Sequence, residues 1–186
     1  MEARKLLNTI SFIEKLKGTM RHCQTSNGYE ESVASHSWMM ALMAYFMKDE
    51  FEQIDMNKVI LMCLVHDLGE CFTGDIPVFQ KIDQNEEKEK ELLENWIESL
   101  EEPFASELMS LFKEMNEQKT MEAKIYKSID KMEAVIQHNI SDLSSWLPLE
   151  YDLNLTYAFD QVSFNEYLLN LRNEIKKDTI LKIEKG

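Results

Sequence analysis

The fold is decided by Val59-Ile-Leu-Met-Cys-Leu-Val65, the most hydrophobic stretch of the 186-residue chain, which runs directly into His66-Asp67. Asp55 is a suitable N-cap for a helix through this stretch, and Thr73-Gly74 is its expected end. Two turns of this helix are apolar on every side, so we expect it to lie at the centre of a helical bundle. The apolar run is too short to span a bilayer.

The rest of the chain also favours helix. Five glycines and three prolines are too few for a sandwich or barrel of short strands. We read residues 19–31 as a loop containing Asn27-Gly28, and residues 141–160 as an irregular packing segment. Further helices are expected over residues 3–17, from Ser32 to about Lys48, from about 85 to 100, from Pro103 to about Glu117, from Thr120 through Ile136, and from about Val162 to Lys177. The prediction is one all-α domain over residues 1–186, a bundle of about six to seven helices.

Charge and cysteine content narrow the possible functions. The net charge of −14 disfavours nucleic acid polymers and anionic membranes as partners, although a buried cation would still allow a small phosphorylated substrate. The three cysteines form no CxxC pair, and the first residues lack the apolar segment of a signal peptide. We therefore expect free thiols and a cytoplasmic location.

His66-Asp67 is the first candidate for chemistry, because a buried His-Asp pair needs a hydrogen-bond partner, a charge or a metal. Neighbouring residues differ by about 100° around a helix, so both side chains can reach one point beside it. Glu70 follows one turn later on the same face. Taken alone, His36 and Asp130 have ordinary structural explanations, as a helical histidine and a solvated acid.

Three separated motifs, taken together, are more specific. They are Glu31-Ser-Val-Ala-Ser-His36-Ser-Trp, Val65-His-Asp-Leu-Gly-Glu70-Cys-Phe-Thr-Gly-Asp75-Ile-Pro and Ala123-Lys-Ile-Tyr-Lys-Ser-Ile-Asp130-Lys-Met-Glu-Ala. In order and spacing, over about residues 12–140, the chain resembles the HD-domain 5′-deoxynucleotidases. The resemblance implies hydrolysis of (deoxy)nucleoside 5′-monophosphates to nucleoside and phosphate by a homodimeric enzyme. It also implies four ligands for one divalent metal: His36, His66, Asp67 and Asp130. Two imidazoles and two carboxylates suit Mn, Fe, Co, Ni or Zn.

The resemblance also assigns roles around the metal. Glu70 and Asp75 match the catalytic acids of the family, which orient or deprotonate the attacking water and manage the leaving-group proton. Arg21 matches an arginine that binds phosphate, and Asp75 can also hold a substrate hydroxyl. His22 stands where some members have an aromatic residue, and Lys81 lies where some relatives have a lysine that would contact the substrate. Ser35 replaces the acid that usually precedes the first histidine, so support for His36 is expected to differ.

Other functions stay open at this point. Residues 68–129 contain no histidine, which disfavours the binuclear HD phosphodiesterases. Glu70-Cys71 lacks the Glu-Asp pair of the HD hydrolases of guanosine polyphosphates. An HD-type nucleoside triphosphohydrolase, or another small phosphoester hydrolase, remains an alternative. So does a non-catalytic HD domain that binds a nucleotide without turnover.

Overall fold

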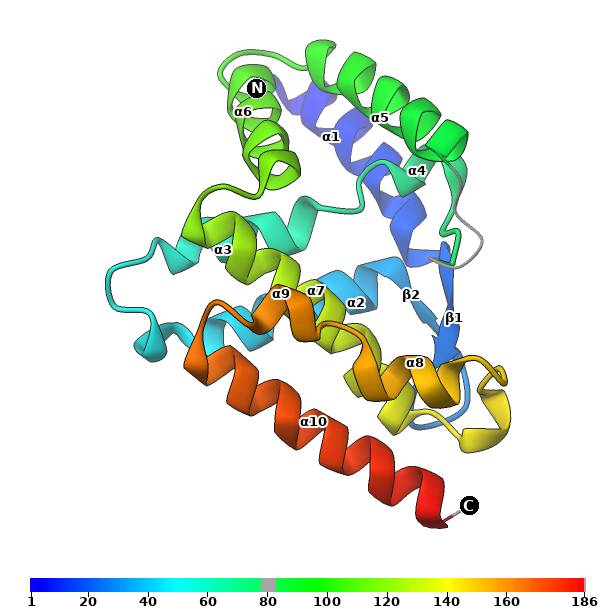
Figure 1. The fold of residues 1–186 in the computed structure, drawn as a ribbon. Helices are drawn as coiled ribbons and strands as arrows, with labels where there is room; N and C mark the ends of the chain where they lie inside the picture. Colours follow the sequence, from blue (N-terminus) through cyan, green and yellow to red (C-terminus); the bar gives the residue numbers. More distant parts are fainter. Residues whose placement is uncertain (78–82, 186) are drawn as a thin grey trace.

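The computed structural model describes residues 1–77 and 83–185, and it confirms the all-α fold class (Figure 1). Among these residues, seven helices have ten residues or more: α1 (Ala3–Ile13), α2 (Val33–Phe46), α3 (Met56–Val65), α5 (Asp83–Glu98), α6 (Phe104–Glu117), α7 (Met121–Ile140) and α10 (Glu166–Lys185). Shorter helices are α4 (Glu70–Thr73), α8 (Glu150–Thr156) and α9 (Phe159–Val162). None of the described helices is long and apolar enough to cross a membrane.

Three helix starts lie where the capping residues predict them. The side chains of Ser32, Asp55 and Thr120 accept hydrogen bonds from backbone N–H groups three residues later, at 3.2, 3.1 and 3.2 Å. Each bond satisfies an N–H that the first turn of a helix cannot pair internally. These caps fix the starts of α2, α3 and α7, the helices that carry or directly precede the candidate metal ligands.

Helix α3 packs against α2, α6 and α7, but it is not enclosed on every side as expected. Val59, Met62 and Cys63 are fully buried in the core, whereas Leu61 and Leu64 are each 46% exposed. The three neighbouring helices cover one side of α3 and leave the other to solvent. Helix α3 therefore has apolar side chains on its solvent side as well as on the side that packs into the core.

Residues 19–31 are a correction to the sequence prediction, because most of them form a two-stranded antiparallel sheet instead of a loop. Strand β1 (Met20–Gln24) pairs with β2 (Glu30–Ser32), and Gly28 occupies the turn at a φ of 82°. An Asn-Gly turn is a hairpin signal. The strands escaped prediction because their side chains are mostly polar, and Arg21, His22 and Cys23 line a cavity instead of an apolar core.

The expected helix end at Thr73-Gly74 is also wrong, because α3 stops at Val65. The backbone then makes tight turns, with N–H groups of Leu68 and Glu70 donating to carbonyls three residues earlier. A new single-turn helix, α4, follows. The argument that one continuous helix presents His66, Asp67 and Glu70 therefore does not hold, although Asp67 and Glu70 still line the same cavity.

The C-terminal third is more helical than predicted. Residues 141–160 contain α8 and the start of α9, and the Leu147 N–H donates to Glu150 Oε2 at 2.7 Å where α8 begins. The last helix begins at Glu166 instead of Val162, with the Asn165 side chain accepting the Leu168 N–H at 3.0 Å. It continues to Lys185 because no glycine or proline interrupts it before the end. In Figure 1, α10 runs along the side of the molecule opposite α1 and α5.

Candidate active site

A cavity of about 390 Å³ lies between the hairpin, α2, α7, α8 and the segment that follows α3. Most of the predicted site residues line it: Arg21, His22, His36, Asp67, Glu70, Asp75 and Asp130. His66 lies behind this lining, with a side chain that is 3% exposed. Lys81 falls outside the described residues. The structure therefore brings together residues that are more than a hundred positions apart in the sequence.

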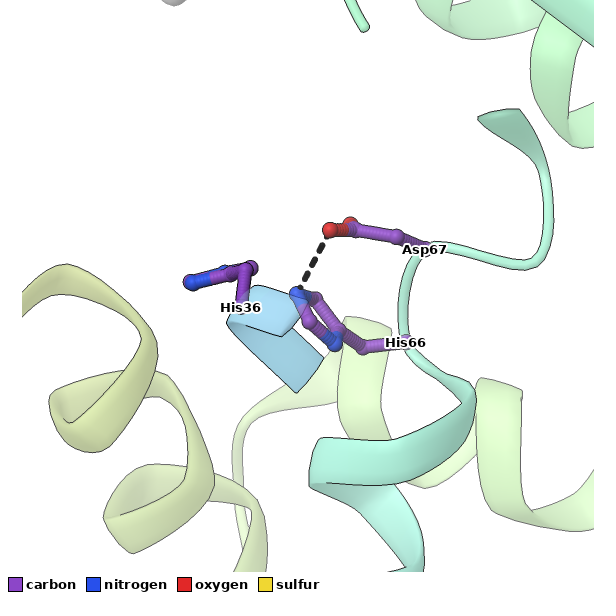
Figure 2. Close-up of side chains that lie close together, drawn as sticks. All are labelled: His36, His66 and Asp67. Atoms are coloured by element: carbon purple, nitrogen blue, oxygen red, sulfur yellow. Dashed lines mark ion pairs between the residues drawn. The ribbon is translucent and has the colours of Figure 1, made fainter. Parts of the chain in front are cut away.

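His66 presents one ring nitrogen to the cavity side because the other is already used. Its Nδ1 lies 2.9 Å from the carbonyl oxygen of Cys63, one turn earlier, and can only donate there. In the neutral ring, the remaining Nε2 is then an acceptor with a free lone pair. It faces Asp67 Oδ2 at 2.9 Å, as Figure 2 shows, and it has no hydrogen-bond donor among the described residues. Two acceptors that face each other at this distance need a proton or a metal ion between them.

His36 is held in a similar way from α2. Its Nδ1 hydrogen-bonds the buried carboxylate of Glu133 on α7, which leaves Nε2 directed toward Asp130 Oδ1 at 3.4 Å. The same Asp130 oxygen lies 3.8 Å from Nε2 of His66. The nearest donor atoms of His36, His66 and Asp67 all lie within 4.8 Å of one another.

This donor set fits a divalent metal. Two imidazole Nε2 atoms and the carboxylates of Asp67 and Asp130 converge, and each imidazole is oriented by a bond at Nδ1, the usual arrangement of metal-binding histidines. The buried lone pair on His66 Nε2 would otherwise stay unsatisfied at a cost in stability. The geometry thus provides four candidate metal ligands and holds both imidazole rings in fixed orientations. A bound cation would also satisfy Nε2 of His66.

The electrostatics favour the same conclusion. Burial alone would raise the pKa of Asp130, but Lys127 and both histidines hold it well below its usual range. Burial opposes the protonation of His36, yet Asp130 and Glu133 outweigh it and raise the pKa of His36 to about 9. Asp130 thus stays ionised, and the neighbouring imidazole of His36 binds a proton readily. Both effects indicate a site that stabilises positive charge.

Three charged residues in or behind the cavity wall were not predicted from the sequence. Glu133 on α7 hydrogen-bonds His36. The acid that supports this histidine therefore comes from α7 and not from the preceding position, which is Ser35. Lys127 Nζ binds Asp130 Oδ2 at 2.7 Å, and Lys131 also lines the cavity. Lys127 and Glu133 shared one signal, spacing, because each is three positions from Asp130 and lies on its face of the helix, whereas Lys131 is its immediate neighbour.

Arg21 has two buried acidic neighbours on the cavity wall. Its Nη1 lies 3.2 Å from Glu31 Oε2 and 3.3 Å from Glu133 Oε2. These contacts orient the guanidinium and leave its other nitrogens for a ligand. With Lys127 and Lys131, Arg21 gives the cavity three basic side chains in a protein whose net charge is −14.

Comparisons with known proteins agree with this geometry. A family model described as HD domain matches residues 13–171. The human 5′-deoxynucleotidase HDDC2 is 32% identical over 139 residues, which cover 73% of this chain and 67% of that protein.

Solved structures share the fold. A protein described as a predicted metal-dependent phosphohydrolase, from Magnetospirillum magnetotacticum MS-1, has a TM-score of 0.78 at 22% identity, over 95% of this chain and 93% of that one. The HD phosphohydrolase DatZ of cyanophage S-2L, bound to dA and one catalytic Zn²⁺ ion, has a TM-score of 0.53 at 20% identity, over 100% of this chain and 95% of that one. The chain therefore belongs to the HD domain family of metal-dependent phosphohydrolases, in the group that contains the HDDC2 5′-deoxynucleotidases.

Proposed function

We propose that this chain is a metal-dependent phosphomonoesterase that hydrolyses deoxynucleoside 5′-monophosphates to nucleoside and phosphate. The observation that carries the proposal is the convergence of two oriented imidazoles and two carboxylates on a cavity with three basic side chains. The similarity to HDDC2 supports the substrate class. A cavity of about 390 Å³ is large enough for a mononucleotide and small for a polymer.

His36, His66, Asp67 and Asp130 would hold the metal, which is a divalent transition ion. When bound, such an ion lowers the pKa of water and offsets the charge of a phosphate. The protein's own contribution begins with orientation: Glu133 and the Cys63 carbonyl fix the two rings, so that both Nε2 atoms face the same point. Arg21, Lys127 and Lys131 would bind the phosphate oxygens from the cavity wall.

Glu70 and Asp75 would handle protons. Glu70 is 7% exposed and lines the cavity beside Asp67, a position from which it can accept a proton from the attacking water. The oxygen of that water bonds to phosphorus while the bond from phosphorus to the 5′ oxygen breaks. The leaving 5′ oxygen takes up a proton, for which Asp75 is the candidate donor.

His22 would influence the choice between deoxyribose and ribose. Its Nε2 lies 3.4 Å from Glu150 Oε1, and His22 lines the cavity from strand β1. An imidazole can accept a hydrogen bond from a 2′-hydroxyl where a larger aromatic ring would exclude it. A pocket that merely fails to welcome an added hydroxyl discriminates by roughly a hundredfold, so we expect a measurable but weakened deoxy preference.

Assembly and location are further parts of the proposal. We propose one domain over residues 1–186 that forms a homodimer in the cytoplasm. Leu6, Leu7 and Ile10 share a face of α1 and are each about half exposed, which supports a contact with a second copy. The three free, buried cysteines support a reducing compartment.

A phosphate-release panel tests the activity. Purified protein would be assayed with Mn²⁺ and Co²⁺ on deoxy- and ribonucleoside monophosphates, on di- and triphosphates, and on a cyclic dinucleotide. We expect release from all deoxynucleoside 5′-monophosphates and less from the ribonucleotides. Release confined to triphosphates or to the phosphodiester would contradict the proposal. Nucleotide binding without any release would indicate the non-catalytic alternative.

A further inference from the structure

The cavity has a second polar region, away from the candidate metal ligands. Its members are His138 on α7 and two residues of α8, Glu150 and Asn154. His138 follows Asp130 on the same helix by a little over two turns, which is about 12 Å. A phosphate near Asp130 cannot contact this region, but the other end of a nucleotide can.

Hydrogen-bonding groups in this region lack partners. Asn154 is 4% exposed and lines the cavity, and its Nδ2 has no hydrogen-bond partner among the described residues. The same holds for Nδ1 of His138. Buried polar groups left unsatisfied cost stability, so their presence in a cavity wall points to a ligand that completes them.

Glu150 adds an acceptor beside the Asn154 donor. Its Oε2 is fixed by the Leu147 N–H, whereas the contacts of Oε1 with the described residues are long, at 3.4 Å to His22 and 3.7 Å to His138. Oε1 can therefore accept another hydrogen bond. Glu150 and Asn154 are one turn apart on α8, so the carboxylate and the amide lie on one face.

The end of α8 that carries Asn154 is held in place from outside the cavity. Arg172 on α10 is fully buried and donates to the backbone carbonyls of Asn154 and Tyr157, both at 2.7 Å. This contact orders the chain at Asn154, one of the residues that line the cavity. A fixed donor loses little conformational entropy when it binds a ligand.

Apolar side chains complete the region. Val135 on α7, Leu153 on α8 and the ring of Tyr157 line the same cavity. A flat aromatic ligand with a polar edge matches such a surface, because its faces contact the apolar groups while its edge reaches the donor and acceptor.

We propose that His138, Glu150 and Asn154 form a distal subsite that binds the hydrogen-bonding edge of the nucleobase. The inference rests on the proposed function, since it takes a nucleotide as the substrate, and it deepens that function by naming what holds the base. Every common base has a donor next to an acceptor on its Watson–Crick edge. One carboxylate beside one amide can therefore bind each of them, so the subsite predicts low preference among the bases.

The test measures binding instead of turnover. Calorimetry on metal-loaded protein would compare deoxyadenosine with 2-deoxyribose, which has the sugar but no base. We expect deoxyadenosine to bind at least about tenfold more tightly. Asn154→Ala should weaken deoxyadenosine binding roughly three- to tenfold, the effect of one hydrogen bond, and leave 2-deoxyribose unaffected. Asn139→Ala is the matched control, because Asn139 lies on α7 outside the cavity lining and also has an unpaired side-chain atom.

The outcomes separate the two proposals. Equal binding of deoxyadenosine and 2-deoxyribose to the wild type would overturn the subsite without using any variant. So would an Asn154→Ala protein that is folded and binds deoxyadenosine as the wild type does. Thermal unfolding checks the fold, and removal of an amide whose Nδ2 has no partner among the described residues should lower the unfolding temperature little. Absence of phosphate release alongside selective deoxyadenosine binding would instead refute the proposed activity and support the subsite.

Discussion

The buried carboxylate of Glu133 accepts a hydrogen bond from Nδ1 of His36. The same oxygen lies 3.3 Å from Nη1 of Arg21, so one side chain orients both a candidate metal ligand and a candidate phosphate ligand. Glu133 is completely buried, and its neighbour Arg21 lines the cavity. A single residue of α7 thus contacts both His36, a candidate metal ligand, and Arg21, a candidate phosphate ligand.

Replacing Glu133 by Gln should weaken metal binding about ten- to a hundredfold, because the neutral amide orients His36 less firmly and no longer favours its Nδ1–H form. Titration of the metal-free protein with Zn²⁺ or Mn²⁺ measures the affinity. Glu122→Gln is a suitable control, since Glu122 also lies on α7 but pairs with Lys58 at 3.4 Å instead. Unchanged affinity in Glu133→Gln would show that His36 does not need this support.

Glu70→Gln should keep the metal and the fold while kcat falls about a hundredfold or more, because the amide cannot accept a proton from water. Steady-state phosphate release and metal content, measured on one preparation, check both parts. Glu86→Gln serves as the control, because this exposed carboxylate lines the same cavity. A Glu70→Gln protein with wild-type kcat would move the role to Asp75.

Sequence patterns predicted the parts of the fold that depend on local chemistry. Ser32, Asp55 and Thr120 are capping residues, and each starts a helix at the expected position. The hairpin was missed because Arg21 and His22 belong to a cavity wall, so its strands lack the alternation of apolar and polar residues. The true end of α3 was missed because the turn after Val65 is stabilised by backbone hydrogen bonds, which no particular residue type predicts.

The candidate site shows the same division. The motifs around His36, His66 and Asp130 have recognisable spacing, so they could be found without a structure. Glu133 could not be distinguished from a solvated helical acid until α2 and α7 were packed together. The region of Glu150 and Asn154 was predicted to be irregular. These residues reach the cavity through contacts with distant parts of the chain, which a local sequence pattern does not reveal.

Gly74→Ala should destabilise the protein by about 1–3 kcal/mol, because Gly74 has φ 75° and ψ 169°, a region open essentially to glycine alone. An added Cβ would meet no atom within 4 Å, so the cost lies in the backbone itself. Gly18→Ala should change stability by less than about 0.5 kcal/mol, since Gly18 has φ −105° and ample space. Denaturant unfolding of both variants checks the difference, and equal stabilities would contradict it.

The three thiols should be inert in the native protein. Burial raises the pKa of Cys23, Cys63 and Cys71, and the reactive form of a thiol is the thiolate. At pH 8, a thiol reagent such as Ellman's should react with the denatured chain at three sites and with the native chain hardly at all. Rapid reaction of a native thiol would show that its part of the core opens readily.

The most direct measurement of the central claim is the metal content of the purified protein and two variants. Elemental analysis after mild purification should give close to one divalent metal per chain, with a sharp decrease in Asp130→Ala and His36→Ala. Asp152→Ala, on an exposed position of α8, should retain the metal. Thermal unfolding would confirm that all variants are folded. Full metal retention in both Asp130→Ala and His36→Ala would contradict the assignment of this site.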